Sequence, residues 1–157
     1  MFYSRLELDG TFRPCTPDTG DELFPNGIFE FNVSRLLAFV CTHADQFPIE
    51  RFELADIADY GAADLDEAVI DAADLSSPIV LAEIAPGRFN VIDGHHRIAK
   101  ARRNGVYAVA GYRLRCPEHI RFLTSTTAYQ RYVEYWNSKV DEATRAVRSN
   151  RQPRAGI

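Results

Sequence analysis

The fold of this chain is decided by the stretch Phe89-Asn90-Val91-Ile92-Asp93-Gly94-His95-His96-Arg97, which continues as Ile98-Ala99-Lys100-Ala101-Arg102-Arg103-Asn104-Gly105. Residues 89–92 have the apolar, β-branched composition of a strand. From residue 94 to 104 the apolar residues recur at helical spacing, and Gly105 suits the left-handed position that follows a helix. The sequence therefore predicts a strand that turns directly into a helix at Asp93-Gly94.

The start of this helix has the chemistry of an anion-binding site. The first turn of a helix leaves backbone N–H groups without internal acceptors, and the helix dipole places positive potential there. Gly94 lets the backbone approach a ligand closely, and Lys100, one turn after His96, adds positive charge on the same face. The predicted phosphate- or carboxylate-binding residues are Gly94, His95, His96, Arg97 and Lys100.

Asp93 can be interpreted in more than one way. Its carboxylate can cap the helix, accept a proton, orient a histidine or hold a metal ion. The alternative to anion binding by His95, His96 and Arg97 is a purely structural role. In that case one histidine would be exposed and the other buried, and Arg97 would form a surface ion pair. Ile98 and Ala101 are expected to face a sheet, and Arg102 and Arg103 to lie in solvent.

The rest of the chain fits one domain spanning residues 1–157. Its class is α+β: a small mixed β-sheet flanked by helices, with an added C-terminal helix. The other expected elements, in chain order, are a strand near 2–8, a loop at 13–27, and a helix that carries Leu36, Leu37, Phe39 and Val40 and is capped by Asn32 or Ser34. A strand at 49–57, a helix at 64–74 capped by Asp64 or Asp66, a buried strand at 79–84, a strand at 106–114, a helix at 124–147 and a flexible tail at 148–157 follow.

Aromatic residues recur at helical spacing in the last predicted helix. Tyr129, Tyr132 and Trp136 share a stripe with Val133 and Val140. Periodic aromatics are usually buried, so this stripe predicts core packing. The alternative is a face that joins two copies of the chain in a homodimer.

Charge is distributed unevenly along the chain. Residues 1–87 hold 4 Lys and Arg against 17 Asp and Glu, and residues 88–157 hold 14 against 5, so balances of −13 and +9 give the net −4. An acidic protein binds nucleic acid poorly, although the Arg-rich tail leaves such a contact open. We expect the two halves to attract each other within the fold.

The three cysteines are widely spaced and odd in number, so reduced, buried or inert thiols are expected rather than a disulfide framework or a zinc site. His43 and His119 stand alone and are expected to be structural. No apolar run approaches the ~18 residues that span a membrane, and the first residues lack the features of a secretory signal. The expected location is the cytoplasm.

The residues around the central motif resemble a known family. This part of the chain looks like the core of the ParB/sulfiredoxin superfamily: it contains Ser77-Pro78-Ile79-Val80, a short turn and the stretch from Phe89 to Arg97. In that family a Pro-Ile-Val-type strand is followed by a hairpin, and a Gly-x-His/Arg-Arg motif then begins a helix. The resemblance covers residues 48–115 and implies a ParB/sulfiredoxin-like fold.

The variations within that family narrow the expected function. Sulfiredoxins carry their catalytic Cys directly after the motif glycine, where this chain has His95. ParB partition proteins have an acidic-Arg-Arg continuation and a DNA-binding domain downstream, which this sequence does not suggest. The Asp-Gly-His-His-Arg form is more similar to the free-serine kinases of the family, in which the motif holds phosphates and an upstream carboxylate is the base.

The resemblance implies Asp93, His95 and Asp59 as catalytic residues, with Asp56 as another candidate for the upstream carboxylate. It implies Mg²⁺, held by Asp93, with ATP, ADP or CTP. The leading hypothesis is a nucleotide- or phosphate-binding protein, either a phosphotransferase or a nucleotide hydrolase acting on a small molecule. A nuclease-like or DNA-associated regulator and a non-catalytic nucleotide-sensing module stay open as alternatives.

Overall fold

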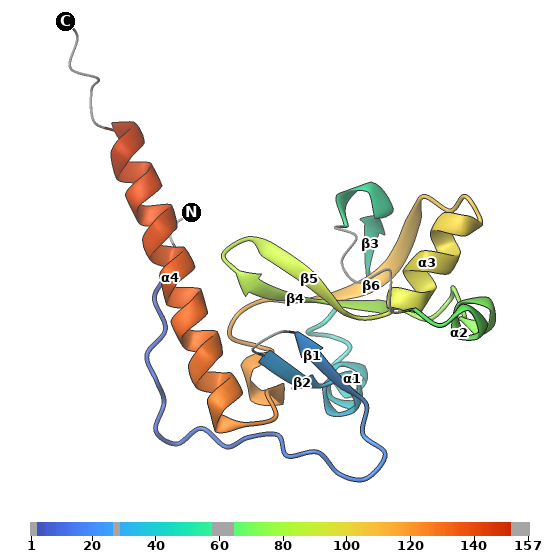
Figure 1. Ribbon diagram of the computed structural model, residues 1–157, viewed down its shortest axis with the longest axis horizontal. Coiled ribbons are helices and arrows are strands. Elements are labelled where there is room, and N and C mark those ends of the chain that lie inside the picture. Colours follow the sequence, from blue (N-terminus) through green and yellow to red (C-terminus); the bar gives the residue numbers. More distant parts are fainter. Residues whose placement is uncertain (1–2, 27–28, 58–64, 152–157) are drawn as a thin grey trace, which may run out of the picture.

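A computed structural model describes residues 3–26, 29–57 and 65–151 of the chain (Figure 1). Its elements in chain order are β1 (Leu23–Asn26), β2 (Phe29–Asn32), α1 (Val33–Thr42), β3 (Glu50–Glu53), the 3₁₀ turn η1 (Leu54–Asp56), α2 (Glu67–Ala72), β4 (Ile79–Ala85), β5 (Arg88–Asp93), α3 (His95–Arg103), β6 (Ala108–Leu114), the 3₁₀ turn η3 (Ile120–Phe122) and α4 (Thr126–Arg151). The predicted class is confirmed: small sheets are flanked by helices, and a long helix closes the chain.

The central sheet has the strand order β3-β6-β4-β5. β4 and β5 form an antiparallel hairpin, and β6 lies parallel to β4 on its other side. β3 pairs antiparallel with β6 at the outer edge. β5 and β6 lie on opposite sides of β4, so the chain must cross over one face of the sheet to pass from β5 to β6. α3 forms this crossover, which lets β6 run parallel to β4.

β4 is the centre of the fold, since all of its residues are buried. Ile79 and Leu81 point to the side of the sheet that α3 covers with Ile98 and Ala101. Their neighbours along the strand point to a larger core on the other side, formed with α1, α4 and the β1–β2 hairpin. The helix therefore packs its apolar face on the sheet, as predicted.

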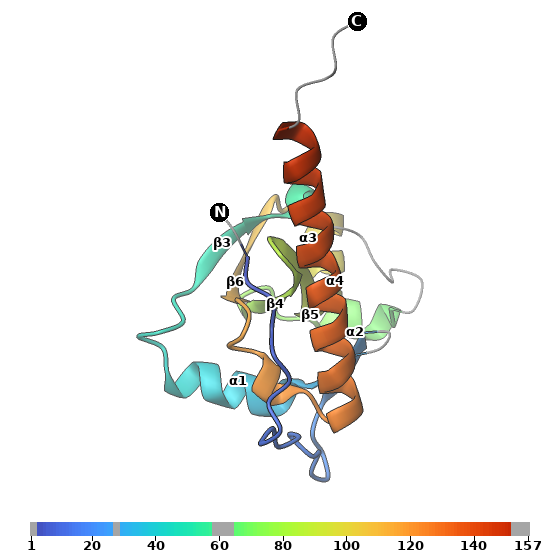
Figure 2. The same cartoon turned by 90° about the vertical axis from the view of Figure 1, so that its left-hand side faces the viewer.

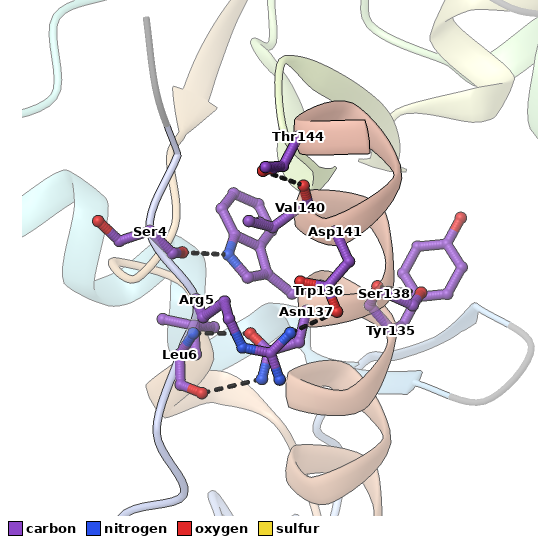
Figure 3. A network of polar contacts seen from close by, with 10 residues as sticks. All are labelled: Ser4, Arg5, Leu6, Tyr135, Trp136, Asn137, Ser138, Val140, Asp141 and Thr144. Atoms are coloured by element: carbon purple, nitrogen blue, oxygen red, sulfur yellow. Dashed lines mark hydrogen bonds and ion pairs between the residues drawn. The ribbon is translucent and has the colours of Figure 1, made fainter. Parts of the chain in front are cut away.

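The aromatic stripe of α4 belongs to this larger core, which confirms the interpretation as core packing. Tyr132 is fully buried, and Trp136 is 3% exposed. An extended segment near the N-terminus lies along the helix (Figure 3). The Asn137 side chain accepts from the Leu6 N–H at 2.7 Å and donates to the Leu6 carbonyl at 2.9 Å, while the Trp136 indole donates to the Ser4 carbonyl at 3.0 Å.

This contact explains why the strand predicted near residues 2–8 is wrong for the described residues 3–8. Asn137 satisfies the N–H and C=O of Leu6 as a neighbouring strand would, so the segment stays extended without joining a sheet. The predicted loop at 13–27 is wrong at its end, where β1 forms with Pro25 inside it. Proline is tolerated there because β1 has a partner on one side only.

Other boundaries also differ from the prediction. β3 ends at Glu53 because the chain turns into η1, whereas a strand to residue 57 was expected. Asp66, rather than Asp64, caps α2 through Ala68 N. Asn32 caps α1 through Arg35 N, as one of the predicted alternatives. α4 continues to Arg151, so the first four residues of the expected flexible tail are helical.

The cysteine and lone-histidine predictions are largely confirmed. The three thiols are free, but none is fully buried: Cys15 and Cys116 are half-buried and Cys41 is exposed. Burial raises the pKa of Cys116 to about 11 and also raises the pKa of Cys15, so both thiols stay protonated and unreactive. His119 is fully buried with Nε2 2.7 Å from the Glu83 carbonyl, which is a structural position.

Candidate anion-binding site

The turn between β5 and α3 has the predicted geometry. Gly94 is the N-cap of α3 and has a φ of +107°. A Cβ at this position would lie 2.5 Å from Cγ2 of Ile79. Glycine is therefore required twice, by the left-handed backbone and by the close approach to β4. Because Gly94 has no side chain, it leaves the N–H groups of the first turn of α3 available to a ligand.

A pocket of about 460 Å³ opens beside this turn. One wall is α2, and the other is the start of α3 with the end of β5; Figure 1 shows the two helices beside each other. The volume is in the range of small-molecule sites. The lining residues are Ala68, Val69, Ala72, Ala73, Asp74, Ser77, Asp93, Gly94, His96 and Arg97.

Arg97 lies in this pocket but is already engaged. Its Nη2 donates to Asp93 Oδ2 at 2.8 Å, and its Nη1 donates to the Pro78 carbonyl at 3.0 Å. The Asp93 and Arg97 side chains are only 13% and 18% exposed, so this is a protected ion pair. A bound anion would have to share Arg97 with Asp93, and Asp93 would act as a base or metal ligand only after loosening this pair.

The two histidines lie on different sides of α3. His96 lines the pocket, with Nε2 3.4 Å from the Asp66 N–H at the start of α2. His95 lies outside the pocket lining: it stacks on Phe24 of β1 with ring centroids 5.3 Å apart, and its Nε2 is 3.0 Å from the Val91 carbonyl. Adjacent helical residues diverge by about 100°, so one ligand cannot readily engage both rings.

Burial lowers the pKa of His95, against the opposing effect of the hydrogen bond to Val91, so the ring is neutral near pH 7. A carbonyl only accepts, which places the proton on Nε2. His95 is thus built into the packing between the β1–β2 hairpin and α3, and its predicted catalytic and phosphate-binding roles have no support from its position.

Lys100, predicted to bind the anion, instead makes hydrogen bonds to α2. Its ammonium donates to the carbonyls of Asp71 and Ala73, both at 2.8 Å. These carbonyls belong to the C-terminal end of α2, where helical acceptors lack internal partners. Arg103 adds an ion pair to Glu67 at the other end of α2. Lys100 and Arg103 of α3 therefore hold α2, which forms one wall of the pocket, against α3.

Arg102 and Arg103 are exposed, as predicted, and each also makes a specific contact. Arg102 donates to the Ile57 carbonyl at 3.0 Å. Among the ion pairs of the described residues, Arg103–Glu67 and Arg113–Glu50 join a cation of the second half to an acid of the first half, in the sense that the charge pattern predicts. Asp59 lies outside the described residues, and Asp56 in η1 does not line the pocket.

The sequence did not reveal Asp74 as a pocket residue. The Ser76 hydroxyl and N–H both bond its Oδ1, at 2.6 Å and 2.9 Å, and these bonds lower the pKa of Asp74. The site thus combines a second carboxylate with His96 and Arg97. Asp74-Leu75-Ser76 is readable as an Asx turn, but no local pattern shows which way that turn faces.

Within the described residues, no group of three or more His, Cys, Asp and Glu side chains is arranged to hold a metal ion. Asp93 and Asp74 are the carboxylates of the pocket, and each is tied to a neighbour. Mg²⁺ commonly binds one or two carboxylates together with substrate phosphates and water. Asp93 and Asp74 are therefore the two pocket carboxylates that could contribute to such a site.

Comparisons of the chain with protein-family models, with curated proteins and with solved structures found no match. Among the helices of the described residues, none combines the length and apolarity needed to cross a bilayer.

Proposed function

We propose that this protein binds a phosphate-bearing small molecule, a nucleotide in the leading case, in the pocket between α2 and the start of α3. The observation that carries the proposal is the convergence of three groups on one hollow: the uncapped first turn after Gly94, the Arg97 guanidinium and the His96 ring. Because Nε2 of His96 accepts from the Asp66 N–H, the neutral ring has Nδ1 left as its donor. Helix N-termini bind phosphate through backbone N–H groups and the dipole, and Arg binds it through paired donors.

The pocket also offers room beside the phosphates. Ala68, Val69 and Ala72 form an apolar wall opposite the donors, against which the body of a ligand can pack. Small-molecule sites typically combine such a wall with a few polar groups that fix orientation.

The ParB/sulfiredoxin-like fold remains part of this proposal. It is supported by the order of β3, α2, the β4–β5 hairpin, α3 and β6, and by the position of the glycine motif at the start of α3. In that family the motif faces phosphates, which agrees with the orientation of Gly94, His96 and Arg97.

We further propose phosphoryl transfer or nucleotide hydrolysis with Mg²⁺ as the reaction class. Phosphoryl transfer depends mainly on positioning and charge neutralisation. Arg97 would neutralise the phosphates, and Asp93, released from Arg97 as the anion binds, would orient the metal or accept a proton. The nuclease-like alternative needs both histidines on one metal ion, and their divergence does not support it.

The test is thermal unfolding with ATP, ADP or CTP and Mg²⁺. A ligand at about one hundred times its Kd adds about 2.7 kcal/mol of stability, which is a rise of roughly 5–10 °C for a chain of this size. His96→Gln should abolish most of this rise. His43→Gln removes an imidazole at the end of α1, outside the lining of the pocket, and should leave the rise intact. Unchanged melting with every nucleotide at millimolar concentration contradicts the proposal.

Turnover separates the catalytic hypothesis from a nucleotide-sensing module. Release of inorganic phosphate that is lost in Asp93→Asn, while the nucleotide still raises the melting temperature, supports phosphoryl chemistry. Stabilisation without any release or transfer of phosphate supports sensing alone.

A further inference from the structure

The C-terminal part of α4 leaves the body of the protein. Val140 is the last buried residue of the helix, which continues to Arg151. Every residue from 142 to 151 is exposed. Figures 1 and 2, taken at right angles, both show this end of α4 standing clear of the sheet and of the other helices. We call residues 143–151 the α4 arm.

The α4 arm is strongly basic. Its sequence is Ala-Thr-Arg-Ala-Val-Arg-Ser-Asn-Arg, with three arginines and no acidic residue. Arg145, Arg148 and Arg151 are three residues apart, so each lies about 60° from the previous one and about 4.5 Å further along the axis. The three guanidinium groups therefore share one side of the helix. Arg148 and Arg151 make no ion pair with another described residue.

The acidic residues at the base of the arm are already matched by cations. Arg5 pairs with Asp141 and, by hydrogen bonding to it, lowers the pKa of that carboxyl (Figure 3). Lys139 lies 3.3 Å from Glu142. The charge that the arm presents to a partner is thus positive along its whole length.

The acidity of the whole chain does not cancel this charge. Arg145 lies close to Asp141 and lowers the pKa of that carboxyl. At a rise of about 1.5 Å per residue, Arg148 and Arg151 lie about 9 and about 13 Å beyond Glu142, the last acidic residue before the arm. These distances exceed the screening length of about 8 Å at physiological ionic strength. The net charge of −4 is therefore a poor guide to what the arm attracts.

The shape and composition of the α4 arm fit duplex DNA better than an acidic protein. A protein groove receives a helix through an apolar stripe, but Val147 is the only large apolar residue of residues 143–151. A bare helix about 10–12 Å across matches the major groove of B-form DNA, which is about 12 Å wide and bordered by phosphates.

We propose that the α4 arm binds the phosphate backbone of duplex DNA, through Arg145, Arg148 and Arg151 and without reading base sequence. This site is distinct from the pocket at α3, and neither depends on the other. Duplex DNA carries about one charge per 1.7 Å of axis, so all three arginines find phosphates within the length of the arm.

The test measures the affinity of the full chain for a labelled, mixed-sequence DNA duplex two helical turns long, by fluorescence anisotropy across a salt series. Three phosphate contacts predict a slope of log K against log salt of about −2.7, so affinity falls about twenty-fold between about 50 and 150 mM salt. The triple variant Arg145→Gln, Arg148→Gln, Arg151→Gln should lose this binding.

The matched control is Arg13→Gln, Arg51→Gln, Arg131→Gln, which changes net charge equally at exposed sites outside the arm. It should keep the affinity and the salt slope. Circular dichroism and Trp136 fluorescence report that both variants are folded. Equal loss of binding in the two variants, or undiminished binding in the arm variant, overturns the proposal.

Two competitors decide the class of partner. If poly-glutamate displaces the labelled duplex as effectively as unlabelled DNA of equal total charge, the partner is an acidic protein and the assignment is overturned. Tighter binding to duplex RNA of the same sequence would overturn it in favour of RNA. Failure here leaves the nucleotide proposal untouched, because the melting experiment reads a different site.

Discussion

Gly94→Ala tests whether the turn before α3 is held by steric necessity. The substitution adds one methyl group at a residue with a φ of +107°. That methyl would lie 2.5 Å from Cγ2 and 2.9 Å from Cβ of Ile79, the first residue of β4. Neither atom is the end of a flexible side chain, so the strand and the helix must move apart.

The magnitude follows from two contributions. A left-handed conformation costs an L-residue about 1–2 kcal/mol relative to glycine. Overpacking a filled core costs about 1–3 kcal/mol more. The variant should therefore lose about 2–5 kcal/mol of unfolding free energy, a large part of the roughly 5–15 kcal/mol that holds a domain together.

Urea denaturation followed by Trp136 fluorescence measures this loss, and Gly105→Ala is the matched control. Gly105 has a φ of +71°, but a Cβ there meets nothing within 4 Å. The control therefore carries the backbone strain alone, and the difference between the two variants isolates the contact with Ile79.

A double-mutant cycle with Ile79→Ala identifies that contact directly. Removing Cγ2 of Ile79 should make Gly94→Ala cheaper than in the native background, giving a coupling of about 1–3 kcal/mol. The reasoning is refuted if Gly94→Ala and Gly105→Ala are equally destabilising and the cycle shows no coupling.

Three further outcomes are expected. Lys100→Met should speed hydrogen exchange of the α2 amides before it lowers global stability, because the bonds to the end of α2 are lost. His119 has its pKa lowered to about 4 by burial, so the unfolded chain binds more protons than the folded one below pH ~6.5. The free energy of unfolding should accordingly fall by about 3 kcal/mol as pH drops from about 6.5 to 4, and less in His119→Gln under urea titration. Asn137→Ala removes both bonds to the Leu6 backbone and should make trypsin cleavage after Arg5 faster, with the wild-type rate contradicting the role of Asn137.

The elements of this chain were predictable wherever a local pattern specified them. Periodic apolar residues located α3 and α4, and a continuous apolar run located the fully buried β4. The pattern failed at residues 3–8, whose alternation resembled a strand although the partner is the side chain of Asn137. It also failed at β1, because Pro25 suggested a loop where a strand with a single neighbour tolerates it.

The residues of the candidate site were likewise predicted only in part. The sequence named Asp93, Gly94, His96 and Arg97, and these four residues do line one pocket. It also named His95 and Lys100, which point elsewhere, and it omitted Asp74. Residue type and helical position were enough to predict donors at the start of α3, but not which of them face the hollow.

By itself the sequence determined the strand, the glycine turn and the helix with an open N-terminus, because these depend on residues within one helical turn of each other. Only the tertiary structure decided what each side chain does there. The partner of Arg97 at Pro78 is 19 residues away, and those of Lys100 and His96 are up to 30 residues away. Those distances are closed by the packing of α2 and β4 around α3, which no local periodicity encodes.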